Sequence, residues 1–382
     1  MYYEYQSKSR LSNFDWSLIT FVDLSSYESK FQMLSSWYNE TTQVCSNLKQ
    51  KLSMSEFSQA CQQFEQATLP YLFEIEANHD SIWLGLGLNT SGTHKRVRKN
   101  IITKGAEILF GSNPLFNTES IFQKIIEFVK TKVVDTDLTN NKIRLLQTST
   151  SEITRKASDL SAHQNKIETN IKILSSQVQK SMQTVNILLT KTTLIEQSLL
   201  FTILLNQYAY ETQSLIAILN SAMHGRIHST VLPPSKLLRE LREIQLTLPT
   251  GTQLPLTPSK QNIPKYFQIS TTTVLTKDKF LLFSLTFPIA TIDEYTLYRP
   301  VPLPHYVINN NAILISPTAD YIALSDDSEF YFTLNTAQRE ACLVLQPYTL
   351  CKGNLPINHK ASSKLCEILL LKSPQTIPNS FL

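Results

Sequence analysis

The feature that most constrains the fold is a long segment, residues 137–223, that contains neither proline nor glycine. Residues there recur every seven positions in two interleaved, mainly apolar series. Such a pattern places both series on one face of a helix, and that face must pack against another helix. The predicted core residues of this seam are Leu146, Ile153, Leu160, Ile167, Ile171, Leu174, Val178, Val185, Leu188 and Ile195, and the second series continues to Leu199.

As one helix, at least fifty of these residues would form a rod of roughly 80 Å, at about 1.5 Å per residue. A single globular domain cannot bury so long a seam. Mixed isoleucine, leucine and valine in both series favours three or more strands. We therefore predict a homo-oligomeric coiled coil with register-fixing polar layers at Thr150, Gln164, Ser181 and Thr192. The alternative is a long helix within an intramolecular antiparallel bundle.

Composition argues against several classes of protein. Only 17% of the residues are charged, and the net charge of +4 comes from scattered basic residues, so we expect no nucleic-acid partner. The chain has 8 glycines in 382 residues, too few for many phosphate-binding loops. Hydrophobic residues make up 42% of the chain, which argues against intrinsic disorder, and the length suggests two or three domains.

The sequence contains no recognisable catalytic or metal-binding constellation. The seven histidines are widely spread, and the pair His224 and His228 is separated by Gly225, which we expect to end a helix. No phosphate loop, nucleophile elbow or pair of carboxylates stands out. We predict that the protein is not an enzyme and uses no cofactor or metal.

The five cysteines form two groups, Cys45 with Cys61, and Cys342 with Cys351 and Cys366. None has the spacing of a zinc site, which leaves buried thiols or disulfides. Cys342 and Cys351 are a candidate local pair, although connectivity cannot be read from sequence. Glycosylation sequons begin at Asn39 and Asn89 and fit an extracellular protein.

The segments before the rod differ from it in character. Residues 16–22 form a short apolar run, and residues 27–66 are helix-compatible. A dense basic cluster at residues 94–99 is followed directly by a small apolar segment at residues 101–111.

Beyond Gly225 the pattern changes to a short charged helix at residues 235–246, a proline-rich loop and then strands. Alternating and β-branched runs with short connections predict an antiparallel β domain. The predicted strands are residues 267–275, 280–289, 295–298, 306–315 and 320–324.

Taken in order, these features resemble the baculovirus F envelope fusion protein family, which includes the Env proteins of insect gypsy-like retroviruses (errantiviruses) and their endogenous, host-resident copies. The similarity covers nearly the whole chain. The motifs that carry it are DWSLITFVDLSSY, RKNIITKGAEILFG, PPSKLLRELREIQLTLPTGTQLPL, EYTLYRPVPLPH, DYIALSDDSEFYFTL and the C-terminal cysteine group.

The resemblance implies an α+β, class I fusion-protein-like fold, with a long trimeric coiled-coil helix and an antiparallel β-rich C-terminal domain. It divides the chain into an N-terminal subunit-like region at 1–98, a fusion-peptide-like segment and linker at 99–136, the coiled coil at 137–225 and a disulfide-bearing β domain at 226–382. Subunits of this family stay disulfide-linked after cleavage, which implies that Cys45 or Cys61 reaches the C-terminal group.

The resemblance also implies functional segments and partners. A host furin-like protease would cut the homotrimer within the basic cluster, freeing an apolar N-terminus that enters a target membrane, and a cell-surface receptor is a further expected partner. The implied location is the virion envelope, cell surface or secretory pathway. The cleavage-like residues are Lys95, Arg96, Arg98 and Lys99, and the fusion-peptide-like residues are Ile101, Ile102, Gly105, Ala106, Ile108, Leu109, Phe110 and Gly111.

The sequence departs from the family pattern at these points. A furin-like site favours arginine four positions before the cut and at the cut, with a basic residue between them, whereas this chain has Lys95 at the first of these positions and Val97 just before the cut. Lys104 and Glu107 add charge to the apolar segment. The printed chain shows neither a signal peptide nor an apolar run long enough to cross a bilayer. We therefore expect an Env ectodomain with fusion machinery that is functional or impaired. The alternatives are a domesticated interaction protein that binds a receptor or an Env without fusing membranes, and a cytosolic coiled-coil scaffold with reduced cysteines.

Overall fold

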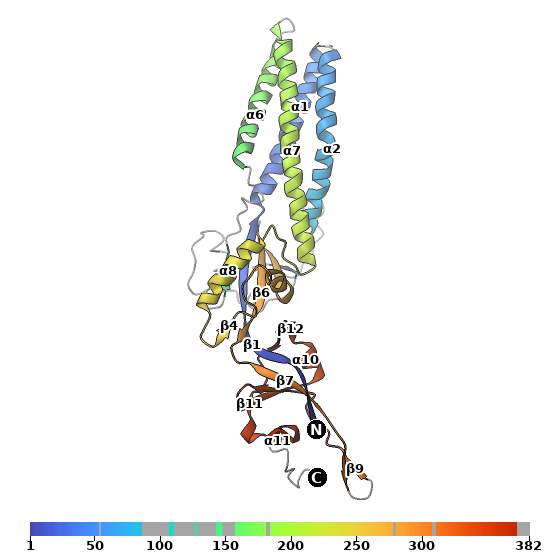
Figure 1. Ribbon diagram of the computed structural model, residues 1–382. Coiled ribbons are helices and arrows are strands. Elements are labelled where there is room, and N and C mark those ends of the chain that lie inside the picture. Colours follow the sequence, from blue (N-terminus) through green and yellow to red (C-terminus); the bar gives the residue numbers. More distant parts are fainter. Residues whose placement is uncertain are drawn as a thin grey trace. The chain divides into compact units, whose positions relative to one another are not determined.

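The computed structural model describes residues 1–52, 55–85, 107–110, 127, 143–146, 157–180, 184–277, 280–307 and 311–372 (Figure 1). The chain divides into two compact units. The strand unit consists of Met1–Ser17, Pro234–Ser270 and Thr286–Leu382, and the helical unit consists of Leu18–Pro233 and Thr271–Leu285. The four consecutive segments expected from the sequence do not coincide with these units, because the first residues of the chain join the C-terminal strands.

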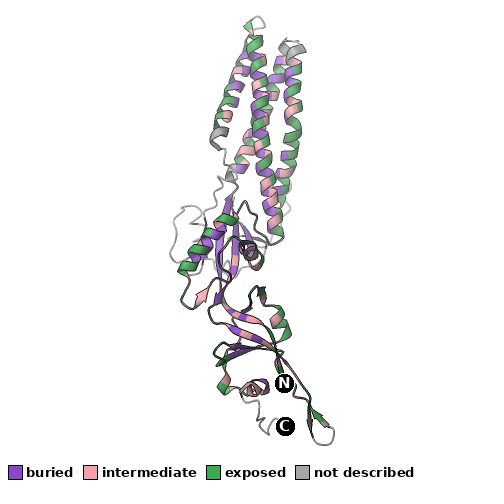
Figure 2. Ribbon diagram, in the orientation of Figure 1, coloured by how far each residue is buried: buried purple, intermediate pink, exposed green. Residues whose placement is uncertain are grey.

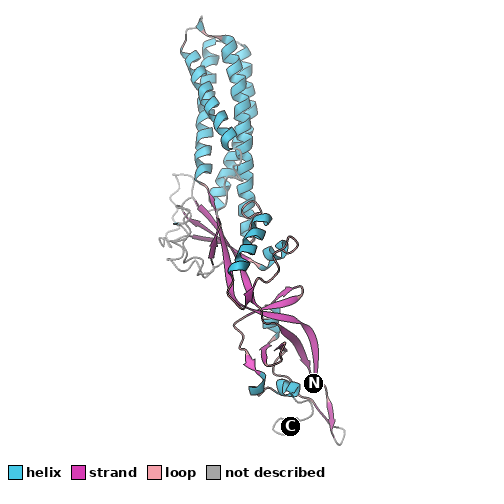
Figure 3. Ribbon diagram, turned by 60° about the vertical axis from the view of Figure 1, so that its left-hand side comes forward, coloured by secondary structure: helices cyan, strands magenta, loops and turns pink. Residues whose placement is uncertain are grey.

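The helical unit contains four long helices that lie side by side (Figures 1 and 3). Both α2 and α6 pack against α7, and α1 packs against α2 and α6. The helices are α1 (Ser25–Leu52), α2 (Ser55–Gly85), α6 (Ala157–Gln179) and α7 (Ile187–Met223).

Local sequence explains why α1 packs as it does. Its buried residues are spaced by three, four or seven positions, which puts them on one face of a helix. This heptad-like spacing was not singled out in the sequence, but it makes α1 a partner for the predicted seam. The buried residues are Tyr27, Leu34, Trp37, Thr41, Val44, Cys45 and Leu48.

The uninterrupted rod predicted for residues 137–223 is not found. Helix α6 ends at Gln179, and α7 begins at Ile187 after Asn186, whose side chain accepts a hydrogen bond from the Leu189 amide at 3.0 Å. Residues 143–145 form a strand instead of helix. The chain reverses between α6 and α7 because their apolar faces find partners in α1 and α2 (Figure 1). The alternative of an intramolecular antiparallel bundle therefore describes this structure.

The C-terminal end of α7 agrees with the prediction made for Gly225. This residue has a φ of +66°, a left-handed conformation that suits glycine. Its amide donates to the Ala222 carbonyl at 2.9 Å, and the Arg226 amide donates to the Ser221 carbonyl at 2.9 Å. These bonds close the helix with the arrangement common at α-helix C-termini.

Short strands complete the helical unit. Strand β2 (Glu107–Phe110) pairs antiparallel with β5 (Thr271–Lys277). Strand β3 (Ile143–Leu145) pairs with β1 (Tyr2–Asp23), and the amide of Leu146 donates to the Ile19 carbonyl at 2.7 Å. The segment that precedes α6 and α7 in sequence is thus held to the N-terminal strand.

In the strand unit, the N-terminal strand β1 lies inside the sheet, with β7 (Tyr295–Val301) next to it on one side and β6 (Phe280–Thr291) on the other. Most pairings are antiparallel, as predicted, but β13 (Tyr348–Lys352) pairs parallel with β1. The remaining strands are β4 (Thr252–Gln253), β8 (His305–Val307), β9 (Asn311–Ile313), β10 (Tyr321–Ser325), β11 (Phe330–Leu334), β12 (Leu343–Leu345) and β14 (Asn358–His359).

Short helices pack on these strands. Helix α8 agrees with the predicted charged helix and buries Leu237, Leu241 and Ile244 on one face. Residues 263–269 form α9, so the strand predicted from residue 267 begins later, at Thr271. The single strand predicted at residues 306–315 is instead the antiparallel pair β8 and β9. The helices are α8 (Pro234–Thr247), α9 (Ile263–Ile269), α10 (Thr336–Glu340), the 3₁₀ helix η3 (Lys360–Ser362) and α11 (Cys366–Lys372).

Candidate functional site

The described part of the chain holds no group of three or more histidine, cysteine, aspartate or glutamate side chains that could bind a metal ion. Many of the residues singled out in the sequence that the structure describes lie on helix faces, in strand β2 or in two disulfides. These elements are the candidates for a site of binding or conformational change.

Helix α7 carries an exposed apolar face. Leu188, Ile195, Leu199 and Tyr210 are 72%, 53%, 62% and 63% exposed, and Ile203 is also exposed. Successive members of this set are seven or four positions apart, so all five lie on one face of the helix. Figure 2 shows exposed segments along this helix. We call these five residues the α7 stripe. Leu188 and Ile195 belong to the seam predicted from the heptads.

The N-terminal part of the predicted seam is used inside the bundle. Ile167, Ile171 and Leu174 of α6 are buried, and Leu174 packs with Leu194 of α7 in a cluster that also contains Val178 and Val185. Leu146 is buried beside β1. Ile153 lies outside the described residues, as do Thr150 and Ser181, and no side-chain environment is described for Leu160.

By length and composition, α7 is the one helix among the described residues that could cross a membrane, with a mean hydropathy of 1.4. No run of consecutive apolar residues had suggested this. The opposite face of α7 packs against the neighbouring helices, as in a core helix. Its buried residues include Leu194, Phe201, Leu205 and Leu215.

Polar contacts also join α7 to α1. Lys30 Nζ lies 3.0 Å from Glu211 Oε2, and the Glu211 side chain is almost fully buried. The hydroxyl of Tyr208 donates to the Tyr27 carbonyl at 3.2 Å, and burial is the largest cause raising the pKa of Tyr208 above its ordinary value. A buried charge left without its partner is costly, so these contacts specify how the two helices pack.

His79 lies at the centre of an aromatic cluster that sequence reasoning missed. Its ring stacks on Phe31 with centroids 4.2 Å apart and on Tyr27 at 5.8 Å, and its Nε2 accepts a hydrogen bond from Trp83 Nε1 at 2.8 Å. Burial lowers the pKa of His79, opposed by the nearby carboxylate of Asp80. The sequence signal that could have identified His79 is its position, because it lies on the same face of α2 as the apolar residues of that helix.

The cleavage-like residues Lys95, Arg96, Arg98 and Lys99 lie outside the described residues, as do Ile101, Ile102, Gly105, Ala106 and Gly111 of the fusion-peptide-like segment. The described part of that segment is β2, which contains Ile108, Leu109 and Phe110. Its backbone pairs with β5, with Ile108 opposite Leu275 and Phe110 opposite Val274. The end of the segment is therefore tied to a strand that follows the bundle in sequence.

The first disulfide joins the two N-terminal helices. Cys45 of α1 and Cys61 of α2 have Cα atoms 5.8 Å apart, and both side chains are fully buried beside Leu48 and Leu174. This pairing corrects the expectation that Cys45 or Cys61 reaches the C-terminal group. The two cysteines are 16 positions apart in sequence, which lets consecutive antiparallel helices bring them together.

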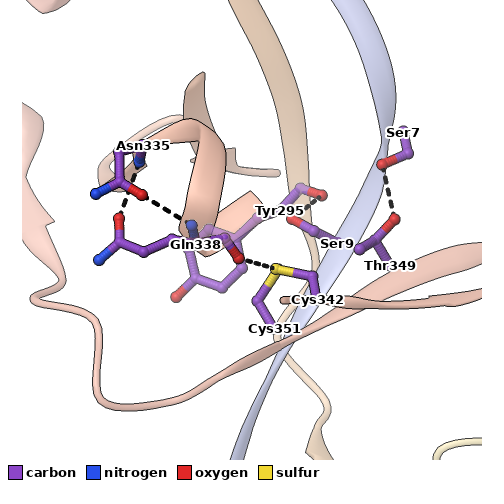
Figure 4. The surroundings of a disulfide bond; sticks show 8 residues. All are labelled: Ser7, Ser9, Tyr295, Asn335, Gln338, Cys342, Thr349 and Cys351. Atoms are coloured by element: carbon purple, nitrogen blue, oxygen red, sulfur yellow. Dashed lines mark hydrogen bonds between the residues drawn. A yellow bond between two sulfur atoms is a disulfide. The ribbon is translucent and has the colours of Figure 1, made fainter. Parts of the chain in front are cut away.

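The second disulfide, Cys342–Cys351, confirms the candidate local pair and supports the strand next to β1 (Figure 4). It connects the end of α10 to β13. Asn335 and Gln338 cap α10 reciprocally, and Cys342 Sγ lies 3.2 Å from the Gln338 carbonyl oxygen. Because a disulfide sulfur carries no proton, this is a close contact and not a donated hydrogen bond.

Strand β13, which contains Cys351 of this disulfide, is also hydrogen-bonded to β1. The hydroxyls of Ser7 and Thr349 are 3.1 Å apart, and Ser9 Oγ donates to the Tyr295 carbonyl at 3.3 Å (Figure 4). Leu11 of β1 shares a buried cluster with Cys342 and Cys351. The disulfide is therefore part of the packing that holds the N-terminal strand.

Two further sequence predictions concern single residues. Cys366 is a free thiol at the start of α11 and is partly exposed. Asn39 is exposed on α1, as a glycosylation site requires, while Thr41 of the same sequon is buried and accepts a hydrogen bond from Gln197 Nε2 at 3.2 Å. Asn89 lies outside the described residues.

Comparison with known proteins shows the family to which the chain belongs. The model of the Baculovirus F protein family matches residues 1–379. A protein of Lymantria dispar multicapsid nuclear polyhedrosis virus named envelope fusion protein is 23% identical over 155 residues, which are 40% of this chain and 23% of that protein. The chain thus matches less than a quarter of this relative's length, and both names describe fusion proteins, not a class of enzyme. Because the family model covers nearly all of its residues, the chain belongs to the Baculovirus F protein family.

Proposed function

We propose that this chain is the ectodomain of a class I envelope fusion glycoprotein that merges membranes by refolding a trimeric helical rod. Membership of the Baculovirus F protein family supports a viral envelope fusion glycoprotein at the level of the family. The observation that supports the trimeric mechanism most directly is the α7 stripe, an apolar helix face without a partner within the described chain.

The stripe supports a homotrimer because three of its residues continue the heptad seam. Leu188, Ile195 and Leu199 would be buried if three copies of α7 met along this face. Exposed contiguous apolar surface is typical of interfaces between proteins. The proposed occupant of the stripe is the same stripe on two further copies of the chain.

The link between α6 and α7 supports refolding. Residues 180–186 contain no proline and no glycine, and the heptad series runs through them without a phase change. The same residues are therefore compatible with the helical hairpin found here and with one continuous helix. Straightening the hairpin would carry α6 to the end of α7 and extend the seam into the rod predicted from the sequence.

We propose that a host furin-like protease cuts within Lys95–Lys99 and that residues 101–116 enter the target membrane. Pairing of Glu107–Phe110 with β5 would then be a contact that must be released before insertion. Lys104 and Glu107 each weaken entry, since a charge within hydrocarbon costs about 2.5 to 3.5 kcal/mol on insertion scales. The proposed site of action is the virion envelope or a cell surface, where a receptor is a further partner.

The second candidate is an interaction protein that binds a receptor or an Env without fusing membranes. The departures at Lys95, Val97, Lys104 and Glu107 favour it. A cytosolic scaffold is not retained, because it requires reduced cysteines and four of the five are paired.

The trimer is tested by light scattering on the purified chain, secreted with an added signal peptide. We expect the mass of three chains for the wild type and of one chain for Ile195→Asp/Leu199→Asp, because two buried charges per copy oppose assembly. Both residues are exposed within one chain, so helix content should be unchanged. Gln63→Glu, at an exposed position on α2, should remain trimeric.

Fusion itself is tested by displaying the same chains on cells with an added membrane anchor and measuring cytoplasmic mixing with neighbouring cells. Mixing by the wild type and not by the double variant supports the proposed function. A trimer that is cut but never mixes cells would favour the second candidate. A folded wild-type monomer would contradict both the rod and the trimer.

A further inference from the structure

The β8–β9 hairpin stands apart from the other strands of the strand unit. Among the described residues its two strands pair only with each other, from His305↔Ile313 to Val307↔Asn311, as a separate two-stranded sheet. Figure 1 shows this hairpin extending away from the other strands of the unit. A two-stranded hairpin on its own is marginally stable in water, so a partner for this one would stabilise it.

Both faces of the hairpin are exposed and apolar. Successive side chains of a strand point to opposite faces, so a strand that packs on a core buries every second residue. Ala312 and Ile313 of β9 are neighbours in sequence and both are exposed, as is Leu314 directly after them. The exposed fractions are 39% for Ile313 and 57% for Leu314, and Leu303, just before β8, is 54% exposed.

The hairpin also lies in the longest stretch of the chain without a charged side chain. Residues 300–319 contain no aspartate, glutamate, lysine or arginine, and charge returns on either side at Arg299 and Asp320. Exposed apolar residues that gather in one place are typical of interaction sites. The missing charges restrict the partner to one that offers apolar surface and no charge to pair with.

The base of the hairpin is firmly held. Strand β7 continues to Val301, with Tyr2 of β1 opposite it. On the returning side, the buried Glu367 carboxylate accepts hydrogen bonds from the amides of Thr318 and Ala319, both at 3.2 Å. The apolar residues are therefore carried on a fixed support, which lowers the entropy cost of binding through them.

A lipid surface fits these features better than a protein surface. A protein that docks on a hairpin covers one face or one edge of it, whereas lipid surrounds an inserted tip and takes up apolar side chains from both faces. No charge has to leave water in residues 300–319, in contrast to Lys104 and Glu107 of the fusion-peptide-like segment. The outer edges of a two-stranded sheet keep unpaired backbone groups, which excludes a deep position in hydrocarbon.

We propose that the β8–β9 hairpin, through Leu303, Ile313 and Leu314, inserts shallowly into the interfacial layer of a lipid bilayer. This inference goes beyond the proposed function, which assigns lipid contact to residues 101–116, and it requires neither cleavage nor a trimer. A contact without charges should depend little on anionic lipid or on salt.

The experiment is flotation of the full secreted chain, carrying Arg98→Ala to keep it intact, with phosphatidylcholine vesicles. We expect the chain to float with these vesicles, and the bound fraction to change little when phosphatidylserine or salt is added. Binding that appears only with phosphatidylserine and is lost in salt would overturn the proposal, because it would indicate the basic cluster at residues 94–99 instead.

Matched variants locate the contact. Leu303→Asp/Leu314→Asp should lower vesicle binding about tenfold or more, because two charges would have to leave water. Val344→Asp/Ile357→Asp introduces the same charges at exposed apolar positions elsewhere in the strand unit and should bind as the parent chain does. Ile101→Asp/Ile102→Asp should also leave binding unchanged, which separates this contact from the fusion-peptide-like segment.

A fluorescent reporter gives a second readout, which holds even if the aspartate variant does not fold. The three native tryptophans, Trp16, Trp37 and Trp83, are buried, so they provide a constant background. Leu314→Trp should shift its emission to the blue on vesicles and be quenched by brominated phosphatidylcholine. Val344→Trp should show neither change.

Three further results would each overturn the proposal. One is equal flotation of the parent chain and a folded Leu303→Asp/Leu314→Asp variant, and another is a bound Leu314→Trp chain that brominated lipid does not quench. The third is a folded parent chain that ignores phosphatidylcholine; if the aspartate variant then has a lower mass in light scattering, the hairpin contacts a second copy of the chain. Failure of the trimer or cell-mixing tests would leave this inference standing, since flotation of the intact chain depends on neither.

Discussion

At the scale of single residues, the charge state of His79 affects the packing of the bundle. Its Nε2 accepts a hydrogen bond from Trp83, and its ring stacks on Tyr27 and Phe31. Protonation of His79 Nε2 would point its new N–H at the Trp83 N–H and so break this hydrogen bond. It would also place a positive charge among the aromatic rings. Burial therefore lowers the pKa of His79, and Asp80, Glu28 and Glu76 oppose that shift only in part.

This predicts a pH dependence with a definite sign. The unfolded chain binds the proton near the ordinary pKa of about 6.5, and the folded chain binds it only at lower pH. Stability should be full above about pH 6.5 and should fall as the pH decreases from there to the folded pKa. Each unit of lowering is equivalent to about 1.4 kcal/mol. Urea unfolding of the helical unit between pH 7.5 and pH 5 measures the effect.

The control for this prediction is His79→Gln, whose side-chain oxygen can still accept from Trp83 but does not titrate. Its loss of stability over the same pH range should be smaller than that of the wild type. Equal slopes for the two proteins would mean that other groups produce the pH dependence.

At the scale of elements, the hairpin between α6 and α7 is the feature on which the proposed refolding depends. It is held by short-range contacts: the amide of Asn186 donates to Gln177 Oε1 at 3.1 Å, and Asn186 caps α7. Asn186 has φ −84° and ψ 98°, an extended conformation that favours a following proline. Ile187 is the first residue of α7, a position where proline is well tolerated.

We therefore predict that Ile187→Pro separates the two states. In the hairpin it should leave helix content and thermal stability nearly unchanged. In a continuous helix it would lie in the interior and cost about 3 kcal/mol or more in each chain. Circular dichroism should show a normal fold, and the cell-mixing assay should show reduced fusion.

The matched control is Ile187→Ala, which removes the same exposed side chain but keeps the amide and favours helix in both states. It should fuse cells as the wild type does. Normal fusion by Ile187→Pro would argue that α6 and α7 never join into one helix.

At the scale of the whole molecule, the proposed cut decides whether the chain acts as one subunit or two. Lys95 and Val97 are the residues that depart from a furin-like site. Lys95→Arg/Val97→Lys should raise the fraction of cut chain in secreting cells, as seen by two fragments on a denaturing gel. Arg98→Ala should abolish these fragments. If the double variant stays as intact as the wild type, the basic cluster is not the protease site.

Features that depend on local spacing were predictable from the sequence alone. Heptads predicted helix across residues 137–223, a range that contains α6 and α7. Gly225 predicted the end of α7, and the short separation of Cys342 and Cys351 made them a candidate pair. The collinear motifs indicated the family that the comparison with known proteins then showed. In each case the information lies within a few residues of chain, or in their order.

Which surfaces meet could not be predicted from local sequence. The rod predicted across residues 180–186 is a hairpin here because α1 and α2 supply partners for the seam, and no local signal distinguishes the two ways of burying it. Cys45 pairs with Cys61 because α1 and α2 fold back on each other. Strand β1 was missed because its first half is polar and lacks an apolar run. Its place in the sheet is created by strands roughly 290 to 340 residues away. Burial is a property of pairs of surfaces, and one sequence segment carries only half of each pair.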